Sequence, residues 1–187
     1  MVVKEGQWER KAVAIKTLSF MTPQSGSEIP RVQRRNGVFL GSPTREVRFL
    51  QYSKLWGHPN IMQLLGISWT QESHYEELED MHVLRPIVVV ELANWGSDQN
   101  MKEELGMLSL TIKGSLIGDI ISGVAALRSL GIIHGDVKPQ NVLIFLQERP
   151  IAKIADFGET THSLYPESEK LGDSRQWKSP EMYPQFV

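Results

Sequence analysis

The 187-residue chain contains no cysteine, which excludes disulfides and thiolate metal sites and permits the reducing interior of a cell. A strong excess of one charge is also missing, because 20 lysines and arginines stand against 22 aspartates and glutamates. The chain therefore has little field to attract nucleic acid or anionic lipid. Residues 1–6 lack the apolar core of a signal peptide, and the apolar run 87–90 is too short to span a bilayer. We expect an intracellular protein, cytoplasmic or nuclear, with no nucleic-acid or membrane partner.

The composition that is present suits a folded, soluble chain. Hydrophobic residues make up 41% and charged residues 22%, enough for one sizeable core or for two lobes that share a cleft. The pattern of the first half predicts, in chain order, a hairpin over 2–3 and 11–18 with Gly6 in its turn, a long loop over 19–41, a helix from Ser42 to Gly57, and strands over 61–69 and 84–92.

The pattern breaks at residues 94–97, which read N-W-G-S. Such residues are typical of a turn or loop, and we place a boundary there between a first region, 1–93, and a second, 94–187. Beyond it, apolar residues recur at helical spacing over 110–130, which predicts an amphipathic helix. Short strands are predicted over 142–145 and 152–154.

Most of the candidate catalytic and metal-binding residues lie in two short motifs. Residues 133–144 read I-H-G-D-V-K-P-Q-N-V-L-I, and residues 154–158 read I-A-D-F-G. Transfer of a γ-phosphoryl group needs its nucleophile held in line, and Asp136 is the candidate to orient the attacking hydroxyl and accept its proton. Asn141 offers a neutral oxygen and Asp156 an anionic one, a pair that suits magnesium bound to phosphates. Each residue alone could be an ordinary turn or capping residue; their joint spacing favours catalysis.

Two further motifs complete a known order. V-A-I-K at residues 13–16 provides a lysine on a strand, and S-P-E at 179–181 follows D-F-G. In this order the motifs resemble those of eukaryotic-type serine/threonine protein kinases, and the sequence as a whole resembles fungal kinase domains. The resemblance implies an α+β, two-lobed fold, in which an antiparallel sheet with one helix precedes an incomplete helical lobe. It also implies ATP and Mg²⁺ as cofactors and a protein substrate with a serine or threonine acceptor.

The resemblance assigns roles to individual charged residues. Lys138, two positions after Asp136, would neutralise charge on the transferred phosphoryl group, as in serine/threonine-specific kinases. Lys16 would hold the α- and β-phosphates, and Glu46 on the facing helix would aim it. Helical register alone could instead suggest Phe49, which cannot pair with a lysine.

The resemblance also implies where the adenine lies. Main-chain groups in the hinge between the lobes, the Glu91 C=O and the Ala93 N–H, would read its edge, and the other expected contacts are Ala14, Val90 and Leu143. His134 and Phe157, with Leu50 from the helix, resemble a stacked apolar spine that links the lobes. A packing role therefore suits His134 better than acid–base work.

The chain departs from the family at one position and at both ends. Gly135 stands where most such kinases have an arginine that pairs with a phosphorylated activation loop, so the electrostatic reason for that switch is missing. Activating phosphorylation is therefore not expected at Thr160, Thr161, Ser163 or Ser168. The first strand, the glycine-rich loop and the later helices would be absent, so we expect poor ATP binding and slow or no turnover. The alternative is an inactive, pseudokinase-like nucleotide-binding or scaffolding module.

Overall fold

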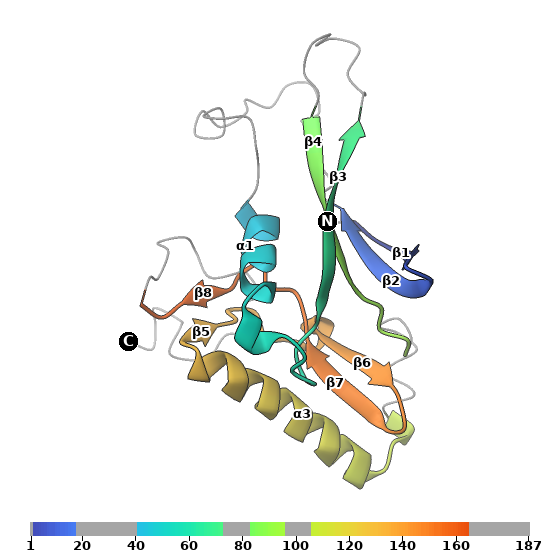
Figure 1. Ribbon diagram of the computed structural model, residues 1–187. Coiled ribbons are helices and arrows are strands. Elements are labelled where there is room, and N and C mark those ends of the chain that lie inside the picture. Colours follow the sequence, from blue (N-terminus) through green and yellow to red (C-terminus); the bar gives the residue numbers. More distant parts are fainter. Residues whose placement is uncertain (1, 18–40, 73–82, 96–105, 165–187) are drawn as a thin grey trace, which may run out of the picture.

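The computed structural model describes residues 2–17, 41–72, 83–95 and 106–164. The predicted loop over 19–41 lies outside these residues except for Gly41, which is the first residue of helix α1, and the S-P-E motif and Ser168 also lie outside them. Figure 1 shows a twisted sheet with one helix beside it in the upper part, and a long helix beneath a hairpin in the lower part. In chain order the elements are β1 (Val2–Trp8), β2 (Lys11–Thr17), α1 (Gly41–Leu50), the 3-10 turn η2 (Ser53–Leu55), β3 (Leu64–Glu72), β4 (Val83–Glu91), α3 (Leu110–Ser129), β5 (Ile132–Ile133), the 3-10 turn η3 (Pro139–Asn141), β6 (Val142–Leu146), β7 (Pro150–Ile154) and β8 (Thr161–His162).

The upper sheet has four antiparallel strands in the order β1-β2-β4-β3. In β2 and β4, Ala14 pairs with Val90 and Lys16 with Val88. Side chains alternate between the two faces of a strand, so Ala14 and Lys16 share one face. This confirms the predicted antiparallel sheet with one helix, and it fixes the two residues of the V-A-I-K motif that face the same way.

The turn of the first hairpin differs from the prediction. Gly6 lies within β1, opposite Val13, and the turn is made by Glu9 and Arg10. Both turn residues have positive φ, 47° and 66°, as two-residue hairpin turns require to match the twist of the strands. Neither position holds a glycine or asparagine that would indicate the turn, so the prediction that Gly6 makes the turn is wrong.

Helix α1 is also shorter than predicted. It ends at Leu50, and the chain then turns through η2 to Gly57, which has a φ of 70°. The indole N–H of Trp56 donates to the Leu50 carbonyl at 3.2 Å. A helix end leaves carbonyls without intrahelical partners, and this bond satisfies one of them and allows the chain to leave the helix axis.

Helix α3 begins where Ser109 caps it, its hydroxyl accepting from the Ile112 amide at 3.3 Å. It packs on β7 of the β6–β7 hairpin. Gly123 lies at the closest approach, because a Cβ there would come within 2.7 Å of the Asn60 carbonyl oxygen. The glycine that interrupts the apolar pattern of the sequence is thus the residue that lets the helix approach the upper part of the chain.

By length and composition, α3 is the one helix among the described residues that could cross a membrane, with a mean hydropathy of 1.5. Its centre, however, carries Asp119, which is buried and accepts two hydrogen bonds from Arg149 at 3.0 Å and one from the Ala152 amide at 3.0 Å. Burial acts to raise the pKa of Asp119, but these bonds outweigh it and hold the pKa below its ordinary value. This pairing fastens α3 to the β6–β7 hairpin.

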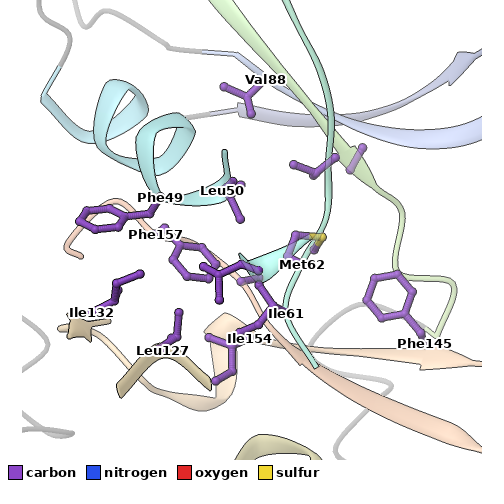
Figure 2. Packing of buried hydrophobic residues seen from close by; sticks show 14 residues of the cluster. Phe49, Leu50, Ile61, Met62, Val88, Leu127, Ile132, Phe145, Ile154 and Phe157 are labelled. Carbon is purple, nitrogen blue, oxygen red and sulfur yellow. The ribbon is translucent and has the colours of Figure 1, made fainter. Parts of the chain in front are cut away.

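One hydrophobic cluster joins the upper and lower parts (Figure 2). Phe157 lies fully buried between Leu50 of α1 and Leu127 of α3, and Ile61 bridges to Ile154 of β7. Burying a large apolar side chain contributes about 1.5–3 kcal/mol. The shared cluster therefore holds the cleft between the two parts in a defined shape.

The short pair β5–β8 was not predicted. Ile132 pairs with His162 and Ile133 with Thr161, so the chain after D-F-G returns to the strand at the start of the 133–144 motif. Two residues are too few to display an alternating pattern. The buried Thr160 hydroxyl adds a bond of 3.2 Å to the His134 carbonyl.

Candidate functional site

A cleft of about 730 Å³ opens between the sheet and the β6–β7 hairpin. Its walls come from β2, the end of β4, η3, β6 and the start of the D-F-G motif, and they carry two charged residues predicted for the site, Lys16 and Asp156. The lining residues predicted to contact adenine are Ala14, Val90, Glu91, Ala93 and Leu143. The structure thus brings together in one cavity residues that lie far apart in the sequence.

Lys16 lies at the upper wall and pairs with Glu46 of α1, with 2.5 Å between Nζ and Oε1. Both residues are buried, 7% and 1% exposed. Burial raises the pKa of the Glu46 carboxyl, and attraction to Lys16 opposes that rise. Phe49, the competing helix position, packs in the hydrophobic cluster instead. The alternative register is therefore wrong, and α1 sits close enough to aim the lysine.

In residues 133–144, which we call the catalytic loop, two polar side chains contact Asp136. The Asn141 amide nitrogen donates to the Asp136 backbone oxygen at 2.8 Å and to its Oδ2 at 2.9 Å. Lys138 Nζ lies 2.7 Å from the same Oδ2. These contacts fix one carboxylate oxygen of Asp136, so that the group is oriented before any substrate arrives.

Asn141 and Asp156 also meet the requirements for a cation bound with phosphates. Asn141 uses its amide nitrogen for both contacts with Asp136, which leaves its oxygen for a metal. Asp156 lies across the same cavity, with a left-handed φ of 62° and Oδ1 accepting from the Gly158 amide at 3.3 Å. No group of three or more His, Cys, Asp or Glu within the described ranges forms a metal site by itself. Magnesium would therefore take its remaining ligands from phosphates and water, as it usually does.

His134 holds the backbone of Asp136 and Ala155 in place. Its ring is 5.0 Å from that of Phe157 in an edge arrangement, Nε2 bonds to the Ala155 carbonyl at 3.1 Å, and Nδ1 accepts from the Asp136 amide at 3.3 Å. Burial lowers the pKa of the imidazole. A neutral ring with both nitrogens occupied by backbone groups suits the packing role that the sequence predicted.

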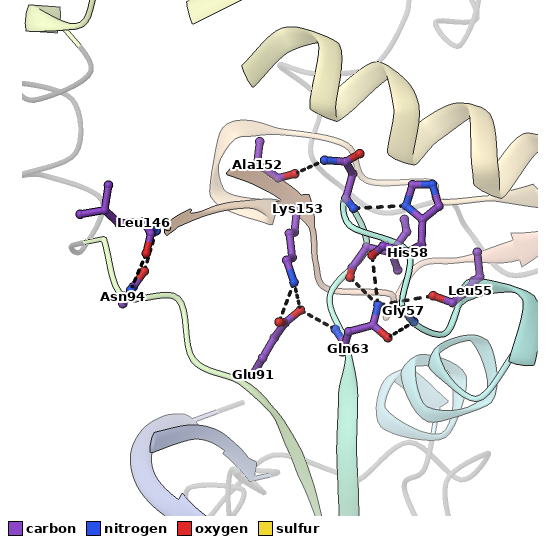
Figure 3. A network of polar contacts seen from close by, with 11 residues as sticks. Leu55, Gly57, His58, Gln63, Glu91, Asn94, Leu146, Ala152 and Lys153 are labelled. Carbon is purple, nitrogen blue, oxygen red and sulfur yellow. Dashed lines mark hydrogen bonds and ion pairs between the residues drawn. The ribbon is translucent and has the colours of Figure 1, made fainter. Parts of the chain in front are cut away.

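Several polar residues around the cleft were missed by the sequence analysis. Arg45 donates to the Gly158 carbonyl at 3.0 Å and so ties α1 to the D-F-G segment. Gln63 and Lys153 both bond to the Glu91 side chain, and Asn94 bonds separately to Leu146 (Figure 3). None belongs to a recognisable motif, and each is bonded to residues distant in the sequence.

Comparison with known proteins decides the family. The family model described as the protein kinase domain matches residues 2–185. The chain belongs to this family. Its cleft is that of a kinase domain, and the predicted family and fold are confirmed; similarity to fungal kinases in particular stays a prediction.

Curated relatives of the kinase domain include plant and animal proteins. Mitogen-activated protein kinase kinase kinase 1a of Physcomitrium patens is 30% identical over 67% of this chain, and serine/threonine-protein kinase/endoribonuclease IRE1 of Oryza sativa subsp. japonica is 30% identical over 66%. Sperm motility kinase Z of Mus musculus is 25% identical over 96%. The matches cover 15%, 15% and 35% of those proteins, so the chain corresponds to a minor part of each.

Proposed function

We propose that this kinase domain transfers the γ-phosphoryl group of ATP to a serine or threonine hydroxyl of a protein, with magnesium. One observation carries the proposal. Lys16, Asn141 and Asp156 line one cavity with the residues expected to contact adenine, and Asn141 in turn holds Asp136. A cavity with an apolar end and a polar end suits a nucleotide whose base and phosphates have opposite character.

The residues of the cleft divide the reaction between them. Lys16, aimed by Glu46, holds the phosphates, and Asp136 orients the acceptor hydroxyl and accepts its proton. The bond from the acceptor oxygen to the γ-phosphorus forms as the bond from that phosphorus to the bridging oxygen of ADP breaks. Magnesium, held by Asn141 and Asp156, would supply neutralisation of the phosphate charge.

Lys138 supports serine or threonine as the acceptor. Its ammonium lies 2.7 Å from the Asp136 carboxylate, so it reaches the place where the hydroxyl and the phosphoryl group would meet. A cation there stabilises charge on the transferred group. The scaffolding alternative is not favoured, because Lys16, Asp136 and Asp156 are all present, Lys16 and Asp156 line one cavity with Asn141, and Asn141 bonds to Asp136.

The test is transfer from labelled ATP to a generic protein acceptor such as casein, at high enzyme concentration because turnover is expected to be slow. We expect Asp136→Asn to lower transfer by about 10²–10⁴-fold, the usual contribution of a positioned base. Glu148→Gln makes the same chemical change on the exposed β6–β7 turn and should leave transfer unchanged. Label on tyrosine alone, or equal activity in Asp136→Asn, would contradict the proposal.

A further inference from the structure

The hinge segment after β4 is attached at both ends to the hairpin of the lower part. Asn94 at one end uses its side-chain amide like a strand backbone: Nδ2 donates to the Leu146 carbonyl at 3.0 Å, and Oδ1 accepts from the Leu146 amide at 2.7 Å. Two parallel bonds to one residue allow little rotation or sliding. Figure 3 shows this contact at the end of β6.

The other end is attached through the side chain of Glu91. Lys153 of β7 donates to both oxygens of this carboxylate, at 2.8 Å and 2.6 Å, and the backbone N–H of Gln63 donates to Oε1 at 2.8 Å. Lys153 is only 7% exposed, and its ammonium lies 4.6 Å from the centre of the Phe145 ring. The carboxylate therefore accepts three hydrogen bonds from two groups, one on the lower hairpin and one on the chain that enters the sheet.

The Lys153–Glu91 contact restricts geometry more than it adds stability. Charge-assisted bonds are short and directional, whereas the cost of removing two charges from water offsets much of the attraction between them. Leu92 and Ala93, between the two attachments, line the nucleotide cleft. Their backbone can shift only if one of the two attachments breaks.

We propose that Asn94 and Lys153 are positioning residues that hold the hinge backbone in register with an adenine edge and so set the preference for adenine over guanine nucleotides. The inference rests on the proposed nucleotide-binding function. Adenine presents a donor and an acceptor where guanine presents an acceptor and a donor. A backbone carbonyl and amide favour the first pattern only while they are held in place, because a mismatched buried polar group then stays unpaired.

The experiment measures the dissociation constants of magnesium-ATP and magnesium-GTP by calorimetry for the parent chain and its variants. Asn94→Ala breaks one attachment without leaving a buried charge. Glu91→Gln combined with Lys153→Met breaks the other without leaving an uncompensated charge. We expect each to lower the ratio of ATP to GTP affinity by about tenfold, the effect of roughly one lost hydrogen bond.

Arg149→Ala provides the matched control. It removes a bidentate ion pair with Asp119 from the same hairpin, away from the hinge, so it tests whether any weakening of the hairpin has the same effect. Its ATP to GTP ratio should stay within about twofold of the parent, less than one typical hydrogen bond.

Three outcomes would overturn the inference. If the parent binds ATP and both hinge variants keep its ratio, the attachment does not set selectivity, while the proposed function stands. If Arg149→Ala lowers the ratio equally, general hairpin stability is the cause. If the parent binds no nucleotide at millimolar concentration, the proposed function falls together with the inference.

Discussion

Two lysine–glutamate pairs with buried lysines border the cleft and do different work. Lys16–Glu46 joins strand β2 to helix α1, both on the upper side. Lys153–Glu91 joins β7 of the lower hairpin to the end of β4. Each lysine is 7% exposed, but the Glu46 side chain is 2% exposed and the Glu91 side chain 21%, so the second pair is the less buried of the two. They differ in which group faces the cavity.

In the first pair the lysine itself lines the cavity, where phosphates would lie, and the glutamate aims it. In the second pair the Glu91 side chain extends to Lys153, and the hinge residues that follow it line the cavity. If the proposed function holds, the first pair supplies a charge that binds the phosphates, and the second attaches the hinge backbone. Substitutions should separate these roles, because loss of a reacting charge changes turnover and loss of an attachment changes binding.

The largest expected effect is on stability, at the first pair. Glu46→Leu leaves Lys16 buried without a partner and should lower the free energy of unfolding by about 3–5 kcal/mol. Adding Lys16→Met should restore most of that loss, because two apolar side chains replace two buried charges. Urea denaturation of the single and double variants measures both values. A double variant no more stable than the single would show that the pair is not the source of the effect.

The second effect is on turnover, and it should distinguish the pairs. Lys16→Met removes a charge that faces the phosphates, so kcat should fall about 10²–10³-fold, as for loss of a positioned electrostatic donor. The double variant Glu91→Gln/Lys153→Met should keep kcat within a few-fold at saturating ATP and change KM instead. Phosphotransfer assays at varied ATP give both constants. Equal losses of kcat would remove the distinction between a reacting and a positioning pair.

The two pairs also differ in how well the sequence predicted them. Lys16, Asp136 and Asp156 lie in short motifs, because phosphoryl transfer needs several polar residue types at fixed spacing. Glu46 required a choice between helix registers, which the structure settled. Lys153 and Asn94 are single polar residues whose partners lie 62 and 52 positions away. Only the folded chain reveals such contacts.

The helices and strands show the same division between features that a local pattern predicts and features that only the fold sets. Long periodic segments were predicted well: 110–130 for α3 and 84–92 for β4 against Leu110–Ser129 and Val83–Glu91. The hairpin turn was misplaced because Glu9 and Arg10 adopt left-handed angles without a sequence signal. Strands β5 and β8 are set by their pairing in the fold, not by local pattern.

A third effect is on how the free energy of unfolding depends on pH. Burial lowers the pKa of His134, so the unfolded chain takes up this proton at higher pH than the folded chain. Stability should be full above the unfolded pKa of about 6.5 and should fall below it, by up to about 1.4 kcal/mol per pH unit. Glu46 acts in the opposite direction, because its raised pKa means that its contribution is lost as pH rises above the unfolded value.

The two contributions can be separated by unfolding in urea between pH 4.5 and 7.5. Glu46→Gln removes the opposing contribution, so its stability should fall more steeply on acidification than that of the parent. His134→Leu should flatten the decline below pH 6.5, whatever its effect on stability at neutral pH. An unchanged slope in His134→Leu would show that another group titrates there.

The smallest effect should come from the segment after D-F-G. Arg45 donates to the Gly158 carbonyl and so holds α1, the helix that carries Glu46, against the D-F-G segment. Gly135 has no charged side chain that could bind a phosphate. The Lys16–Glu46 pair is therefore supported without phosphorylation. Thr161→Ala with Ser163→Ala should therefore leave phosphotransfer within about threefold, the scale of a few tenths of a kcal/mol typical of surface changes. Loss of several hundred-fold in this double variant would mean that a basic group elsewhere reads a phosphate there, and that the Lys16–Glu46 pair depends on it.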